Sequence, residues 1–178
     1  YCEVSSINLP DQTVVGGRDA DLEALCADLA ANYPRKRAIR LATEGAFHTY
    51  FMVAAARLFR DDLAAARFAS PACSVLSNYT AEPHDPEPDA IRTRLFFQLF
   101  KRVNWVGCLN AAVKAGVTTF VEFGGGLGSG EGPAEKRPNL ESIIRKTVKA
   151  AGIEANHVAA INVATLRAAT AALAPAGG

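Results

Sequence analysis

The sequence lacks the features that mark several large classes of protein. Its four cysteines stand far apart and form no C-x-x-C pair, so neither a zinc site nor a disulfide framework is expected. No apolar run reaches the ~20 residues of a membrane-spanning helix, and no stretch has the pattern of a signal peptide. The 19 basic residues are balanced by 18 acidic ones, which leaves no charge excess for binding nucleic acid or a membrane surface. We therefore expect a reduced, cytoplasmic protein.

A nucleophile elbow is also absent. The nearest candidate, Gly128-Ser129-Gly130, is flanked by Leu127 and Glu131 where the G-x-S-x-G frame requires glycines. The glycine-rich run 124–132 follows a predicted strand and precedes a predicted helix, as phosphate-binding loops do. However, no register fits G-x-G-x-x-G and no lysine stands in the G-K-[ST] position. We interpret the run as a flexible connection whose backbone passes close to another part of the chain.

The hydrophobic pattern predicts an α/β fold, because apolar residues alternate between strand-like and helical spacing along the chain. Strands are predicted at 4–7, 13–16, 38–41, 73–78 and 117–123, and helices at 20–31, 50–66, 91–102, 105–116 and 140–148. Asp19 and Asp89 are predicted to cap two of the helices, and Gly116 to end another. The alanine-rich tail from His157 to Ala174 is interpreted as a peripheral helix.

His48 is the side chain with the clearest potential for chemistry. It ends the motif Gly45-Ala46-Phe47-His48, between a predicted strand and a predicted helix, where α/β enzymes tend to place reactive residues. Its imidazole titrates near neutral pH and can take and return a proton as a general base. The alternative from the residues alone is a structural histidine held by hydrogen bonds.

The remaining histidines and the basic clusters give weaker indications of function. His84 lies in an acidic, proline-rich loop and His157 at a predicted helix start, so we interpret both as surface residues. No pair of histidines has metal-ligand spacing. Arg35-Lys36-Arg37 and Lys136-Arg137 are most simply solvated surface, although an acidic carrier protein or the phosphates of a coenzyme are alternatives.

Several short motifs follow one another in a distinctive order. They are Asn8–Gly17, Lys36–Ala38, Gly45–His48, Val75–Asn78, Gln98 with Val103–Trp105, and Gly116–Gly124. In this order and spacing they resemble the C-terminal part of malonyl-CoA:acyl-carrier-protein transacylases and of the acyltransferase domains of polyketide synthases. The resemblance covers most of the chain, from about residue 4 to residue 148.

The resemblance implies a fold and an activity. The fold would be the C-terminal part of an α/β-hydrolase-like acyltransferase core with an incomplete ferredoxin-like small subdomain. Residues 1–43 would belong to the small subdomain and 44–150 to the core, with 151–178 as a peripheral tail. The activity would be transfer of a malonyl-type acyl group from coenzyme A to a serine, then to the phosphopantetheine thiol of an acyl carrier protein. No further cofactor is implied.

The resemblance also implies roles for particular residues. His48 would be the general base that activates the serine, and the backbone carbonyl of Gln98 would orient its imidazole. Asn8 and Asn78 match asparagines near the family's active site. Phe47 matches a position at which a bulky residue accompanies malonyl and a smaller one methylmalonyl, so a slim acyl unit is expected.

Other parts of the family pattern are missing. The serine elbow, the oxyanion glutamine and the arginine that binds the malonyl carboxylate precede the matched region, and the chain begins with Tyr1. We therefore expect an N-terminal half from the same gene product or from a second chain. Glu122-Phe123-Gly124-Gly125-Gly126 stands where the family usually has a Gly-Pro-Gly turn. A non-catalytic remnant that docks a carrier protein, and a hydrolase in which water replaces the acceptor thiol, are the alternative functions.

Overall fold

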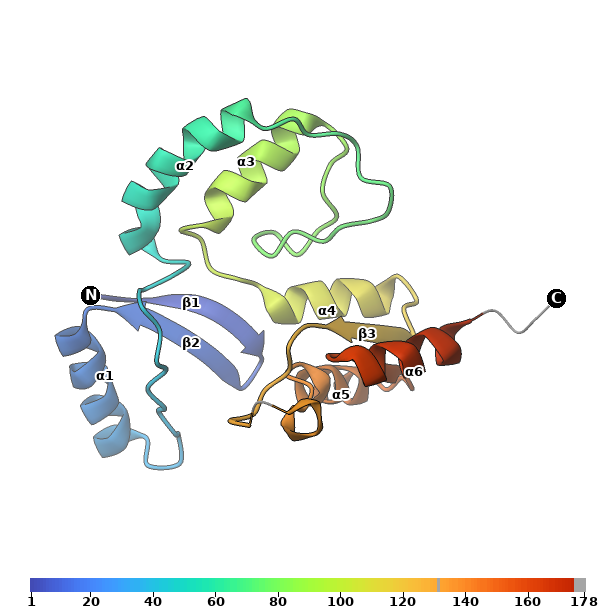
Figure 1. Cartoon of the computed structure of the whole chain (residues 1–178). Coiled ribbons are helices and arrows are strands. Elements are labelled where there is room, and N and C mark those ends of the chain that lie inside the picture. Colours follow the sequence, from blue (N-terminus) through green and yellow to red (C-terminus); the bar gives the residue numbers. More distant parts are fainter. Residues whose placement is uncertain (131, 175–178) are drawn as a thin grey trace. The chain divides into compact units, whose positions relative to one another are not determined.

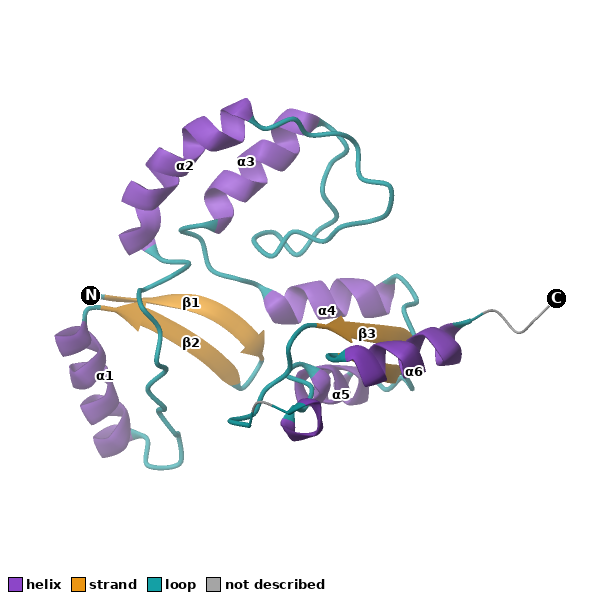
Figure 2. Ribbon diagram, viewed as in Figure 1, coloured by secondary structure: helices purple, strands orange, loops and turns teal. Residues whose placement is uncertain are grey.

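The computed structural model describes residues 1–130 and 132–174, and its mixed α/β character confirms the predicted class (Figures 1 and 2). Glu131, part of the predicted glycine-rich connection, and 175–178, the end of the predicted tail, lie outside the described residues. The chain divides into two compact units, Tyr1–Cys108 and Leu109–Gly178, which are described separately.

The first unit begins with the predicted hairpin. Strands β1 (Cys2–Leu9) and β2 (Gln12–Gly17) pair antiparallel and are followed by helix α1 (Asp19–Asn32). On its other side β1 meets Val103, whose N–H donates to the Ser5 carbonyl (2.9 Å) and whose carbonyl accepts the Ile7 N–H (2.9 Å). These bonds tie the connection between helices α3 (Pro88–Gln98) and α4 (Trp105–Lys114) to the hairpin.

Two predictions for this region are wrong. Residues 38–41 form no strand: the segment is irregular and its apolar Ile39 and Leu41 are 63% and 52% exposed. A short strand needs a partner, and none of the described residues pairs with it. Asp19 is not the N-cap of α1, because Arg18 occupies that position. Asp19 instead lies in the first turn, where its charge suits the helix dipole, and pairs with Arg40 at 2.6 Å.

The remaining helices of the first unit form close to their predicted ranges. The 3-10 turn η1 (Tyr50–Met52) leads into α2 (Val53–Ala65), which packs on α3 (Pro88–Gln98). Ala56 and Leu63 of α2 and Ile91 of α3 are buried, whereas Leu58 and Phe59, on which the predicted helical period rested, are 78% and 39% exposed.

The connection between α2 and α3 differs from its prediction. Residues 73–78 contribute only an isolated bridge between Leu76 and Pro83, because the chain reverses at once in a turn closed by the Ala81 N–H and the Ser77 carbonyl (2.8 Å). Glu87, not Asp89, is the N-cap of α3, with Pro88 at the first helical position, where a missing N–H costs nothing.

The second unit is built on a parallel strand pair. Strands β3 (Thr119–Phe123) and β4 (Asn156–Ala160) pair in register, with α5 (Glu141–Ala150) between them in sequence and α6 (Val163–Leu173) after them. A short 3-10 turn, η2 (Pro133–Glu135), lies in the glycine-rich loop. Helix α4 (Trp105–Lys114), within which the units divide, is followed by Gly116 with a φ of 83°, which confirms the predicted stop.

The prediction of a single helix from His157 to Ala174 is wrong in its first part. Residues 157–160 belong to β4, since they can pair with β3 in a parallel arrangement that α5 makes possible as a crossover. Helix α6 starts only after Asn162, whose side chain accepts the Thr165 N–H at 2.9 Å in a capping box. None of the helices in the described part of the chain is long and apolar enough to span a membrane.

Candidate active site

His48 is attached to the C-terminal end of α3 by two hydrogen bonds. Its ring Nδ1 lies 2.8 Å from the carbonyl oxygen of Gln98, and its backbone N–H donates to the carbonyl oxygen of Leu99 at 3.2 Å. The last carbonyls of a helix lack intrahelical partners and are therefore available as acceptors. Because a carbonyl can only accept, the hydrogen of a neutral imidazole belongs on Nδ1, and Nε2 keeps the lone pair that a base needs.

The Nε2 side of the ring is open to a reacting group. The acceptor on the Nδ1 side belongs to Gln98, the last residue of α3. His48 is only partly buried, and within the described residues Nε2 has no hydrogen-bond partner. The arrangement can accept a proton from a group outside the chain.

The backbone of His48 adopts the left-handed region, with a φ of 61°. Residues other than glycine are uncommon in this conformation, which costs about 1–3 kcal/mol and occurs preferentially at functional sites. The surrounding contacts must therefore hold the residue in place.

The other predicted site residues lie in the same unit but do not bond to His48. The Ser6 hydroxyl donates to the Asn8 side chain at 2.7 Å, and the Asn78 carbonyl accepts the backbone N–H of Asn104 at 2.7 Å. Phe47 directly precedes His48, and 49% of its surface is exposed. The substrate-binding roles of Phe47, Asn8 and Asn78 stay predictions, as does the catalytic role of the His48–Gln98 pair.

The short connection between α3 and α4 links these residues. Leu99, just after Gln98, binds the backbone of His48; Val103 pairs with β1, which carries Asn8; and Asn104 binds Asn78. Gln98 and Val103–Trp105 belong to one of the sequence motifs, but their common supporting role becomes visible only in the folded chain.

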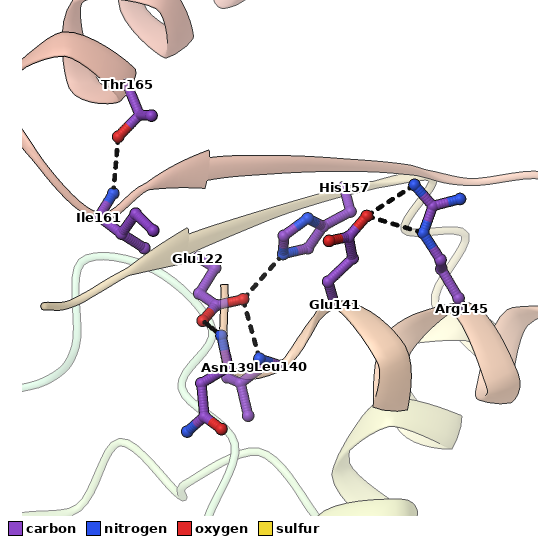
Figure 3. A network of polar contacts seen from close by, with 8 residues as sticks. All are labelled: Glu122, Asn139, Leu140, Glu141, Arg145, His157, Ile161 and Thr165. Carbon is purple, nitrogen blue, oxygen red and sulfur yellow. Dashed lines mark hydrogen bonds and ion pairs between the residues drawn. The ribbon is translucent and has the colours of Figure 1, made fainter. Parts of the chain in front are cut away.

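A second polar group, which sequence reasoning missed, lies in the other unit (Figure 3). Glu122 of β3 is 6% exposed, and its carboxylate accepts the N–H groups of Asn139 (2.6 Å) and Leu140 (3.0 Å) just before α5. The same carboxylate lies 2.9 Å from Nε2 of His157. The signal in the sequence was a lone acid inside an apolar strand.

Neither His157 nor His84 is the surface residue that was predicted. The His157 side chain is 5% exposed, because it points from β4 to Glu122 (Figure 3). His84 is half-buried, and within the described part of the chain its Nδ1 has no hydrogen-bond partner. Burial, and secondarily the charge of Arg94, lowers the pKa of His84 below its ordinary value.

The Glu122 carboxylate occupies backbone N–H groups that follow the glycine-rich run. The N–H groups of Asn139 and Leu140 bind Glu122, so they are not available to a phosphate, in keeping with the lack of a nucleotide-binding frame. The loop itself is closed by two hydrogen bonds between Leu127 and Arg137, at 2.8 and 2.9 Å. The backbone passes close to Glu135 at Gly128, whose φ is 146° and where a Cβ atom would clash.

Comparison with known proteins identifies relatives of the chain. No family model matches it. It is 33% identical over 124 residues to the malonyl CoA-acyl carrier protein transacylase of Bacillus subtilis (strain 168), a match that covers 70% of this chain. The crystal structure of the malonyl-CoA:acyl carrier protein transacylase from Xanthomonas oryzae pv. oryzae superposes with a TM-score of 0.77 at 27% identity, over 96% of this chain. The chain is a homologue of the malonyl-CoA:acyl-carrier-protein transacylases.

The resemblance drawn from the motifs is thereby confirmed. A malonyl-transacylase solved in complex with a type II polyketide synthase acyl-carrier protein has the same fold, with a TM-score of 0.78 at 24% identity over 95% of this chain. The chain spans only part of these transacylases: 38% of the Bacillus protein and 49% of each of the two solved chains.

Proposed function

We propose that this chain is the histidine-bearing part of an acyltransferase that moves a malonyl-type group from coenzyme A to an acyl carrier protein. The observation that carries the proposal is the 2.8 Å contact between His48 Nδ1 and the Gln98 carbonyl, in a chain homologous to transacylases. The Nδ1 contact leaves Nε2 as the base, which is the arrangement that nucleophilic acyl transfer requires.

The proposed reaction has two exchanges at one serine, which lies outside this chain. His48 Nε2 takes the serine proton while the serine oxygen attacks the thioester carbonyl, and the proton then passes to the departing thiolate of coenzyme A. The phosphopantetheine thiol next gives its proton to Nε2 and attacks the acyl-serine, and the proton returns to the serine oxygen. Gln98 would hold the imidazole through both exchanges.

The acyl group and the partner follow from the family. Phe47 would narrow the acyl site toward malonyl, with a discrimination of about 1–3 kcal/mol against one extra methyl group. Asn8 and Asn78 would line the same site. The acyl carrier protein is the proposed acceptor, since a transacylase of the same fold has been solved with such a partner.

Completion of the enzyme by an N-terminal half belongs to this proposal. In the described residues each unit has a sheet of two strands, and a two-stranded parallel sheet such as β3–β4 is rarely stable without cover. Phe123, at the end of β3, is 73% exposed. Further strands from the missing half would complete a hydrolase-like core and a ferredoxin-like lobe, and would bring the serine to His48.

A chimera tests the proposal. This chain would replace the matching region of the Bacillus transacylase, and intact mass would be measured after exposure to malonyl-CoA and then to a phosphopantetheinylated carrier protein. We expect one malonyl adduct that moves to the carrier protein. Release of free malonate instead would favour the hydrolase. A chimera that gains no adduct, while the isolated chain binds the carrier protein, would overturn the proposal in favour of the docking remnant.

A further inference from the structure

Thr49 closes a tight turn around His48. Its side chain is completely buried, and its hydroxyl donates to the carbonyl oxygen of Ala46 at 2.5 Å. Its own carbonyl accepts the N–H of Met52 at 3.0 Å, which starts the 3-10 turn η1. Two hydrogen bonds therefore flank His48. The Thr49 side chain bonds back to Ala46, and the Thr49 carbonyl bonds forward to Met52, so the turn 46–49 holds His48 in its left-handed conformation.

Gly16 of β2 forms the floor of this turn. A Cβ atom placed on Gly16 would lie 2.9 Å from Cγ2 of Thr49 and 3.3 Å from Cβ of Ala46, which is closer than side chains normally pack. The backbone of Gly16 is not in the left-handed region, so space and not conformation requires the glycine. The hairpin thus fits against the turn at the residue next to His48.

We propose that Thr49 and Gly16 are positioning residues that set the orientation of the His48 imidazole. Without the Thr49 hydroxyl the turn loses the bond that opposes the cost of a positive φ at His48, and the backbone relaxes toward ordinary angles. Such a relaxation moves the ring away from the Gln98 carbonyl, so Nδ1 no longer has a fixed acceptor. The effect of these residues on catalysis rests on the proposed function, whereas their effect on the orientation of the His48 ring does not.

The tautomer of His48 is the property to measure, because it would not change if Thr49 and Gly16 only stabilised the fold. Long-range ¹H–¹⁵N NMR spectra of the histidine-labelled chimera distinguish hydrogen on Nδ1 from hydrogen on Nε2, and His48→Gln assigns the signals of His48. We expect wild type to show hydrogen on Nδ1 alone and Thr49→Val, which keeps the shape but lacks the hydroxyl, to show a mixture. Thr49→Ser restores the hydroxyl and should restore the wild-type tautomer.

Two results would overturn the proposal: a wild-type tautomer in Thr49→Val, or a mixture in Thr49→Ser. Circular dichroism of each variant separates a local change from unfolding. If Thr49→Val does not fold, Gly16→Ala tests the same turn from the β2 side, because its methyl group presses on Thr49 and Ala46. A folded Gly16→Ala variant with the wild-type tautomer would likewise refute the proposal.

Kinetics of the chimera give the catalytic consequence. A misplaced base lowers the rate of the chemical step more than substrate binding, so we expect Thr49→Val to lower kcat by about 10- to 100-fold with KM changed less than about threefold. A chimera without any activity would count against the proposed function and leave the tautomer result to decide the positioning role. An active chimera in which Thr49→Val matches wild type would count against positioning alone.

Discussion

The imidazole Nδ1 of His48 lies 2.8 Å from the backbone carbonyl of Gln98, the last residue of α3. The acceptor is therefore a main-chain atom, and no side chain supplies the negative end of the bond. In the proposed mechanism, a helix end would take the place that a carboxylate holds in serine proteases. Substitutions that keep the helix end intact should keep this contact.

The first prediction follows from this backbone acceptor. Gln98→Ala removes the side chain but not the carbonyl, and alanine favours the helix, so His48 should retain hydrogen on Nδ1. The same NMR spectra that test Thr49 would measure it. A mixed tautomer in Gln98→Ala would show that the Gln98 side chain, not the carbonyl, orients the ring.

The second prediction concerns Glu122. Glu122→Gln replaces one carboxylate oxygen by an NH₂ group, which cannot accept the N–H of Asn139 or Leu140, so a buried bond is lost. We expect the free energy of unfolding to fall by about 1–3 kcal/mol in urea titrations. Glu141→Gln, which breaks the more exposed pair with Arg145 in Figure 3, is the matched control, with an expected loss of about 0–1 kcal/mol. Equal losses in the two variants would contradict the anchoring role of Glu122.

The third prediction is a pH dependence of stability that comes from His84. Burial, together with Arg94, lowers its pKa in the folded chain from the ordinary value of 6.5, so the unfolded chain binds the proton more readily. Stability should therefore fall as the pH drops through 6.5 toward the lower folded pKa, and should level off below it. Urea midpoints at several pH values would show a smaller decline in His84→Gln than in wild type. Parallel declines would refute this assignment.

The fourth prediction concerns the cysteines. Cys26 and Cys73 are exposed, whereas Cys108 is buried and its Sγ lies 3.5 Å from the Ser77 carbonyl. Burial raises the pKa of the Cys108 thiol, so less of the reactive thiolate is present at neutral pH. Iodoacetamide followed by peptide mass spectrometry should label Cys26 and Cys73 first and Cys108 last. Labelling of Cys108 as fast as that of Cys26 would mean that α4 is not packed as described.

Local patterns predicted much of the fold. The hairpin around Pro10-Asp11 and the amphipathic helices α2 and α5 were found because turn residues and helical periodicity act over a few neighbours. The strands at 38–41 and 73–78 were wrong because a strand requires a partner that local sequence does not reveal. The same limit hid β4, whose pairing with β3 spans the whole of α5.

The candidate site was predicted from family motifs and not from physics alone. His48 and Gln98 lie 50 residues apart in sequence, and no periodicity indicates that the α3 end meets the loop before η1. Thr49 and Gly16 were missed because burial of a hydroxyl and the close approach of a glycine appear only once the chain is folded. Glu122 and His157 were missed for the same reason. Each is a polar side chain that is expected at the surface, and each can be buried only because it bonds to the other in the folded chain.

The rate of malonyl transfer in the His48→Ala chimera tests the central claim most directly. The matched control is His84→Ala, which removes a histidine that lies in the same unit but outside the candidate site. We expect a rate about 10²- to 10⁴-fold below that of the control, which is the usual contribution of a general base. A His48→Ala rate within about twofold of the control rate would contradict the account, because it would show that the proton is taken by a group other than His48.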